Sequence, residues 1–219
     1  MRKSNIYYRK ASSFFIIISM VALLLSACAP IYIPNQVNVP LLNKSGNLNF
    51  SGAVATSGAE VQLAYSPFTN VGLMANGSFM WGDEDHKHQF VELGGGYYKP
   101  LGTSGVFEVY SGVGYGHSET DDIDGFGNPI GGDYLRVFVQ PSLGADLGFF
   151  EGAMSVRTCY VNFPDYGSEI FFEPALTARA GFDKVKFTSQ FGISVDLSGK
   201  NNFDYIPWII NFGVIFEIR

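Results

Sequence analysis

Charged residues are scarce in this chain, at 16% of 219 residues, whereas soluble domains usually carry about 25%. The deficit indicates that much of the folded surface does not face water. Long apolar runs are missing as well: the longest in the body of the chain, residues 206–216, contains Pro207, Asn211 and Gly213. A membrane helix takes about 20 consecutive apolar residues. A chain that is 47% hydrophobic without such runs therefore points to alternating strands, half of whose residues face lipid.

The first 27 residues have the features of a processing signal. A basic start is followed by a mainly apolar stretch, residues 14–25, which is short for a membrane helix. This order is typical of a secretory signal peptide. The stretch ends in Leu25-Ser26-Ala27-Cys28, which resembles the lipobox of bacterial lipoproteins. The resemblance implies cleavage before Cys28 and acylation of that cysteine; the alternative is an ordinary signal cut near Ala27.

Maturation at this site changes the charge of the chain. Residues 1–27 hold four basic and no acidic residues, so 10 basic against 20 acidic residues remain and the formal charge moves from -6 to -10. We expect no nucleic-acid partner for so acidic a protein. We expect no cofactor beyond the covalent lipid, and as partners the outer-membrane lipids and the outer-membrane insertion machinery. Cys159 then has no disulfide partner, and its place in an alternating strand suggests a packing role.

Residues 28–46 are predicted to form a lipidated tether. Pro30, Pro34 and Pro40 exclude a helix and favour an extended path. We expect this tether to pack against the periplasmic rim of the domain that follows. Its segments 32–35 and 38–41 resemble the leaders of Bacteroidota outer-membrane lipoproteins.

From Asn47 onward the sequence alternates with a period of two. Between residues 135 and 143, for example, Leu135, Val137 and Val139 oppose Arg136 and Gln140. Strands of about ten residues with this pattern are typical of a membrane barrel. We predict an all-β fold, a transmembrane antiparallel up-and-down β-barrel of about ten strands over residues 47–219, with eight strands as the alternative. The ten segments are 47–57, 59–66, 70–82, 88–99, 105–117, 133–145, 148–161, 169–181, 184–197 and 204–218.

The connections between these segments alternate in length. Those after the second, fourth, sixth and eighth segments are short, and those after the third, fifth, seventh and ninth are longer. Short periplasmic turns and long outer loops are the rule in bacterial barrels. Aromatic residues near the strand ends suggest interfacial girdles: Trp81, Tyr115, Tyr134, Tyr160 and Trp208 on the outer side, and Tyr65, Tyr97 and Phe149 on the inner side. The last strand also resembles the C-terminal insertion signal of outer-membrane barrels in Asn211, Gly213, Phe216 and Ile218, although the chain ends in Arg219. A soluble sandwich or a lipocalin-like barrel would instead leave a charged face outside.

Charged residues of one parity are expected to face the lumen. In a narrow lumen such charges satisfy one another, which avoids the desolvation penalty of unpaired charge. This lumen charge network is interpreted either as a structural plug or as an ion path. The plug is favoured because ten strands enclose little more space than eight. The expected members are Glu92, Glu108, Arg136, Glu151, Arg157, Glu173, Arg179, Lys186 and Asp196, together with Glu217 by the same parity.

No residue is assigned a catalytic or metal-binding role. His86, His88 and His117 fall at or near acidic outer loops, and a polar, solvated loop accounts for them. The segment Asp122-Ile123-Asp124-Gly125 fails the calcium-loop spacing at Thr120 and Gly131. We therefore predict a lipid-anchored outer-membrane protein with a structural or surface-interaction role and no enzymatic activity, its surface partner not specified by any motif. The alternatives are a narrow channel for small solutes and, less favoured, a hydrolase at the outer rim.

Overall fold

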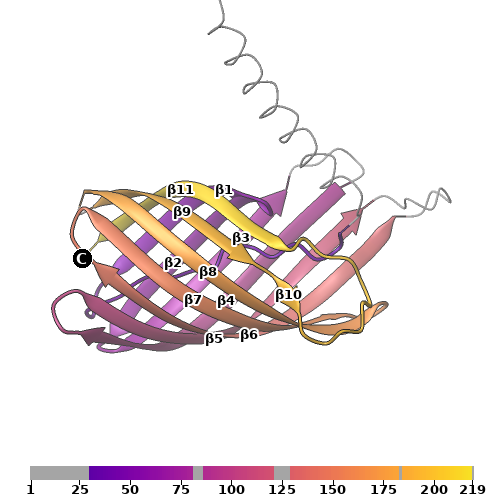
Figure 1. The fold of residues 1–219 in the computed structure, drawn as a ribbon, viewed down its shortest axis with the longest axis horizontal. Helices are drawn as coiled ribbons and strands as arrows, with labels where there is room; N and C mark the ends of the chain where they lie inside the picture. The colour runs from indigo at the N-terminus through magenta and orange to yellow at the C-terminus, as the bar shows by residue number, and fades with distance from the viewer. Residues whose placement is uncertain (1–29, 81–85, 121–128, 183, 219) are drawn as a thin grey trace, which may run out of the picture.

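Antiparallel strands account for most of the residues described by the computed structural model, which are 30–80, 86–120, 129–182 and 184–218 (Figure 1). None of these residues forms a helix long and apolar enough to cross a membrane. The strands are β1 (Leu48–Ala55), β2 (Gly58–Phe68), β3 (Val71–Met80), β4 (His86–Leu101), β5 (Gly105–Thr120), β6 (Ile130–Asp146), β7 (Phe150–Phe163), β8 (Gly167–Phe182), β9 (Val185–Ile193), β10 (Val195–Asp196) and β11 (Trp208–Ile218).

The sheet closes on itself through β1 and β11. From β1 to β9 each strand pairs with the next, β9 pairs with β11, and β11 pairs with β1 from Leu48–Ile218 to Ala55–Asn211. The short β10 continues β9, because both pair with β8 in the same register, and the break lies beside Pro174, which has no N–H to donate. The predicted closed antiparallel barrel of ten strands is therefore confirmed, and the eight-stranded alternative is wrong.

The two ends of the barrel differ in their connections. One end, the turn end, carries the short connections at residues 69–70, 102–104 and 147–149. The first strand also starts and the last strand also ends there, where Leu48 pairs with Ile218. The opposite end, the loop end, carries the long connections, among them residues 197–207. In Figure 1 the C-terminus marks the turn end at the left, and the yellow loop that precedes β11 lies at the right.

The outer surface of the barrel is apolar and the inner surface is mixed. Along β6, the side chains of Leu135, Val137 and Val139 are exposed on the outside, whereas Arg136 and Gln140 are buried inside. A soluble barrel would show the reverse arrangement, because its apolar residues would be withdrawn from water. The exterior is therefore suited to a hydrocarbon environment.

Most of the predicted girdle aromatics in the described part of the chain lie on this exterior. Tyr134 does not: it is buried in the lumen at 1% exposure, so its assignment to the girdle was wrong. The reason is its parity, since Tyr134 shares a face of β6 with the inward Arg136. Trp81 lies outside the described residues. The exposed members are Tyr65, Tyr97, Tyr115, Phe149, Tyr160 and Trp208.

Residues 31–42, here called the plug segment, run through the lumen from one end of the barrel to the other. Every residue of this segment is buried. The expectation that the tether packs against the periplasmic rim was therefore wrong. Side chains just fill the interior of an eight-stranded barrel, and a ten-stranded barrel has a wider interior. The plug segment occupies this additional space, and its prolines keep it extended.

Candidate functional site: the plugged lumen

The backbone N–H groups of Gln36, Val37 and Leu42, in the plug segment, donate to side chains of the barrel wall. The N–H of Gln36 donates to both carboxylate oxygens of Glu60, at 2.8 and 3.0 Å. The N–H of Leu42 donates to Oε1 of Glu108 at 2.9 Å. Buried backbone groups need such partners, since an unpaired one is costly. The wall thus provides the hydrogen bonds that a neighbouring strand would provide in a sheet.

The carbonyl oxygens of the plug segment are bound in the same way. Each of six successive residues, from Asn35 to Pro40, accepts a hydrogen bond from a different wall side chain. This regular pairing means that the lumen is shaped to one extended peptide in one register. The donors are Arg157 to Asn35 O at 2.8 Å, Gln62 to Gln36 O at 3.1 Å, Gln190 to Val37 O at 2.9 Å, Gln140 to Asn38 O at 2.7 Å, Arg179 to Val39 O at 2.5 Å and Asn49 to Pro40 O at 2.5 Å.

Two arginines meet at a single side chain of the plug segment. Oδ1 of Asn35 accepts from Nη2 of Arg136 at 2.6 Å and from Nη1 of Arg157 at 3.0 Å. Each arginine also pairs with a glutamate of the wall, Arg136 with Glu92 at 2.5 Å and Arg157 with Glu173 at 2.7 Å. We call these five residues the arginine cluster. Its formal charges balance, which is the condition under which buried charge is tolerated.

Aromatic contacts enclose the arginine cluster. The hydroxyl of Tyr32, in the plug segment, donates to Oε1 of Glu173 at 3.0 Å and accepts from Nη1 of Arg136 at 3.2 Å. The Arg136 guanidinium also lies 4.1 Å from the centroid of the Phe90 ring, a cation–π geometry. The Tyr32 ring stacks on Phe171 at 4.6 Å between centroids. These rings exclude water, so the ion pairs are screened little.

A second balanced cluster lies towards the turn end. Glu151 pairs with Arg179 at 3.2 Å and with Lys186 at 2.5 Å, and Lys186 also contacts Glu217 at 3.2 Å. Arg179 is the residue that donates to the carbonyl of Val39. We call Glu151, Arg179, Lys186 and Glu217 the turn-end cluster. Both clusters therefore bind the wall and the plug segment at once.

The residues expected in the lumen network divide into these clusters and two other places. Glu108 is buried and holds Leu42 instead of joining either cluster. Asp196 is only half-buried, and its carboxylate accepts from the backbone N–H groups of Ser198 and Gly199. It thus caps the loop that follows β10.

Sequence reasoning missed two buried carboxylates and the plug segment itself. Glu60 has the inward parity of its strand, because Val61 and Leu63 point outwards, so the alternation was sufficient to find it. Glu169 is also buried and accepts from the backbone N–H of Asn202 at 2.5 Å. The plug segment has neither the period of a strand nor that of a helix, so periodicity carried no signal for its position.

The histidines do not share one environment. His88 is buried in the lumen, where Nε2 lies 3.0 Å from the Tyr134 hydroxyl, so its assignment to a solvated loop was wrong. His117 lies at the loop end, with Nδ1 2.7 Å from Asp133 and Nε2 3.2 Å from Glu119. Hydrogen bonding to Asp133 raises the pKa of His117 above its ordinary value. Hydrogen bonds from Tyr115 and then from His117 lower the pKa of Asp133.

The outer loops give no indication of metal binding where the structure covers them. Residues 30–80, 86–120, 129–182 and 184–218 contain no group of three or more His, Cys, Asp or Glu side chains placed to hold a metal ion. The side chain of His86 and residues Asp83, Asp121 and Asp122 lie outside the described part, as does Cys28.

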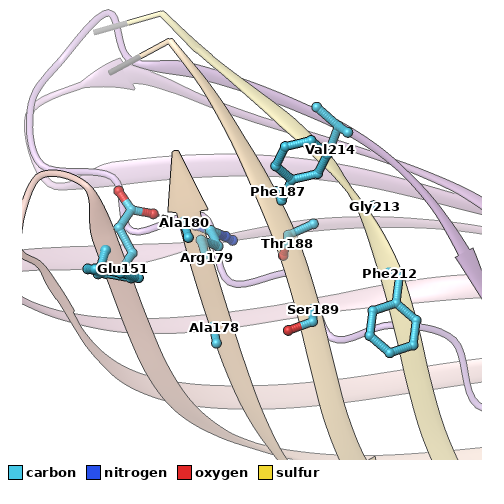
Figure 2. A pocket seen from close by; sticks show the side chains of 11 residues that line it. Glu151, Ala178, Arg179, Ala180, Phe187, Thr188, Ser189, Phe212, Gly213 and Val214 are labelled. Atoms are coloured by element: carbon cyan, nitrogen blue, oxygen red, sulfur yellow. Dashed lines mark hydrogen bonds and ion pairs between the residues drawn. The ribbon is translucent and has the colours of Figure 1, made fainter. Parts of the chain in front are cut away.

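A hollow lies in the outer wall near the turn end, where β8, β9 and β11 run side by side. Figure 2 shows Phe187 and Phe212 beside small residues, Ala178, Ser189 and Gly213. A second hollow on β6, β7 and β8 is likewise lined mainly by apolar and small residues. Both open to the apolar exterior, where hydrocarbon chains of lipid would fill them. Glu151 and Arg179 also line the first hollow, where they are paired with each other in the turn-end cluster.

Comparisons with known proteins identify no family. No family model matches the chain, and no curated protein matches its sequence. A solved structure described as a bacterial polysaccharide outer membrane secretin is 9% identical, with a TM-score of 0.48 over 78% of this chain and 58% of that chain. The N-terminal β-barrel domain of Pseudomonas aeruginosa OprF is 10% identical, with a TM-score of 0.41 over 78% of this chain and 96% of that one. Neither likeness bears on the activity of this chain.

Proposed function

We propose that this protein is a lipid-anchored barrel of the bacterial outer membrane that is closed to solutes and serves envelope structure or surface interaction. The observation that carries the proposal is the plug segment, whose backbone is bonded along its length to the lumen wall. Because so many polar side chains of the wall bond to this one segment, the lumen is occupied by the plug segment and not by solutes. The loops at the loop end are then the part of the protein that is available to a partner.

The exterior supports the placement in the outer membrane. Its apolar surface ends at the loop end between Tyr115 and His117, and between Leu135 and Asp133 on the neighbouring strand. A change from apolar to charged residues at one level on adjacent strands is expected at a membrane–water boundary. The lipid anchor rests on the lipobox ending in Cys28, and the Bacteroidota-like origin on the leader-like segments 32–35 and 38–41.

The channel hypothesis is the weaker alternative. An ion path through this lumen requires the plug segment to move, and each buried backbone group left unpaired costs about 1–3 kcal/mol. The arginine cluster would lose Asn35 at the same time, which would leave two guanidinium groups without a shared acceptor. These losses favour a lumen that stays closed.

Among the residues that the structure describes, the hydrolase hypothesis has support from the His117–Asp133 pair at the loop end. A histidine and a carboxylate often act together in acid–base catalysis. Here the side chains of His117 and Asp133 are 39% and 56% exposed to water and are bonded to each other. Cys159 offers no accessible nucleophile, because it is fully buried beside Glu173. We therefore propose that the protein is not an enzyme, and we expect His117→Ala to leave any turnover of the purified protein unchanged.

Single-channel conductance of the refolded mature protein in a planar bilayer tests the closed lumen. We expect no conductance steps from protein whose insertion has been verified. Reproducible steps that change with Arg136→Ala or Glu173→Ala would contradict the proposal and establish the channel. The lipid anchor has its own test: globomycin treatment of cells should cause the precursor to accumulate, and normal processing would remove lipidation from the proposal.

A further inference from the structure

The direction of the plug segment places its N-terminal side at the loop end of the barrel. At its N-terminal side the segment contacts the long loop before β11. The N–H groups of Ile31 and Tyr32 donate to the carbonyl of Asp204, at 3.1 and 3.2 Å, and the carbonyl of Tyr32 accepts from the N–H of Ile206 at 3.0 Å. Tyr32 and Tyr205 form a parallel β-bridge.

Just after the plug segment, the chain reaches the turn end. The N–H of Lys44 donates to Oδ1 of Asn47 at 3.0 Å, and Oγ of Ser45 donates to the carbonyl of Pro67, beside the β2–β3 turn, at 3.2 Å. The strand β1 then starts at this end, next to the C-terminal strand β11. The chain therefore enters the described structure at the loop end, crosses the whole lumen and only then begins the barrel.

We propose that the acylated N-terminus of the mature protein leaves the barrel at the cell surface, so that its lipid inserts into the outer leaflet of the outer membrane. This inference rests on the lipidation and the outer-membrane placement proposed above. Cys28 is two residues before Pro30, and two residues of chain span at most about 7 Å. The acylated residue therefore has to stay near the loop end and cannot reach the periplasmic leaflet.

Side chains block a return path through the lumen. Tyr32 is fully buried between Phe171 and Tyr134, with ring centroids at 4.6 and 6.1 Å. The arginine cluster closes the next layer around Asn35. Acyl chains cannot be drawn past these layers, so the plug segment has to be in place before the barrel closes. The β1–β11 pairing, which joins the two ends of the strand order, is the seam that closes around it.

Labelling of single cysteines in intact cells tests the proposal. The variants carry Cys159→Ala and one new cysteine: Pro30→Cys at the N-terminal side, Asn201→Cys in the exposed loop before β11, or Lys44→Cys at the exposed turn end. With a membrane-impermeant biotin maleimide, we expect Pro30→Cys and Asn201→Cys to be labelled on intact cells. We expect Lys44→Cys to be labelled only after the outer membrane is disrupted.

Two patterns of labelling would overturn the proposal in different ways. If Pro30→Cys behaves like Lys44→Cys while Asn201→Cys is labelled on intact cells, the barrel is oriented as proposed but its N-terminus is periplasmic. If Lys44→Cys is exposed and Asn201→Cys is protected, the proposed orientation of the whole barrel fails. Failure of lipidation alone is separate, because globomycin would then leave processing unchanged whatever the labelling pattern.

A disulfide provides a second measurement if Pro30→Cys reacts in neither state. Residues paired across a β-bridge lie about 4.8 Å apart, within the Cα separation that a disulfide accepts. The double variant Tyr32→Cys/Tyr205→Cys, in the Cys159→Ala background, is oxidised in whole cells, with the heat-dependent gel mobility of folded barrels as the folding control. Cross-linking of the folded protein supports exit at the loop end, and folded protein without the cross-link overturns it.

Discussion

The side-chain amide of Gln190 pairs with the backbone of Val37 in the way that a neighbouring strand would. The N–H of Val37 donates to Oε1 of Gln190 at 2.8 Å, and Nε2 of Gln190 donates to the Val37 carbonyl at 2.9 Å, although the residues are 153 positions apart. A glutamine amide has the same donor and acceptor as a peptide group. One wall residue therefore satisfies both backbone groups of one plug residue.

Replacing this glutamine should destabilise the protein. In Gln190→Ala, two buried backbone groups of Val37 lose their partners, each at about 1–3 kcal/mol. We expect the free energy of unfolding in detergent, measured by denaturant titration, to fall by about 2–6 kcal/mol. The matched control is Gln89→Ala, the same change at an exposed position of β4. Equal effects of the two substitutions would contradict the role given to Gln190.

The arginine cluster predicts strong coupling between Arg157 and Glu173. Arg157→Met leaves the fully buried Glu173 carboxylate without its arginine partner, and breaking such a pair costs about 3–5 kcal/mol. The double variant Arg157→Met/Glu173→Gln removes both charges and should recover much of this loss. Unfolding free energies for both single variants and the double variant give the coupling. Strictly additive effects would show that the two residues act independently.

Glycines on the wall make room for inward aromatic rings. A Cβ added at Gly114 would collide with the ring of Phe90, whereas one added at Gly52 would meet nothing within 4 Å. We expect Gly114→Ala to lower the unfolding free energy by about 1–3 kcal/mol, as overpacking does, and Gly52→Ala to change it little. Phe90→Ala should relieve the effect of Gly114→Ala. Equal stability losses at the two glycines would exclude the steric explanation.

The His117–Asp133 pair predicts a pH-dependent contribution at the loop end. Because the pKa of His117 is raised in the folded protein, its contribution to stability is fully present below the ordinary histidine pKa. It is lost as the pH rises through the raised value. A histidine NMR titration should give a pKa above the ordinary value, and Asp133→Asn should lower it. The effect on stability should be small and weaken with salt, because both groups are exposed. An unshifted pKa in the unmutated protein would contradict the pairing.

Much of the barrel follows from a period of two in the sequence. Because successive side chains of a strand point to opposite faces, the alternation around Leu135 and Arg136 determines which residue faces out and which faces in. The same rule places Tyr134, Glu60 and His88 in the lumen. Tyr134 and His88 were instead assigned by their positions near strand ends, and Glu60 was missed. Alternation and loop length together also determined ten strands in place of eight.

The position of residues 31–42 was decided only by the tertiary structure. Their prolines determine an extended chain, and an extended chain fits equally well along a rim or through a lumen. The choice depends on contacts with residues far away in the sequence: Arg157 and Gln190 bind Asn35 and Val37 only once all ten strands have closed. Local sequence therefore determined the wall of this protein and the shape of its plug segment, whereas barrel closure determined where that segment lies, because the groups that bind it come together only in the finished barrel.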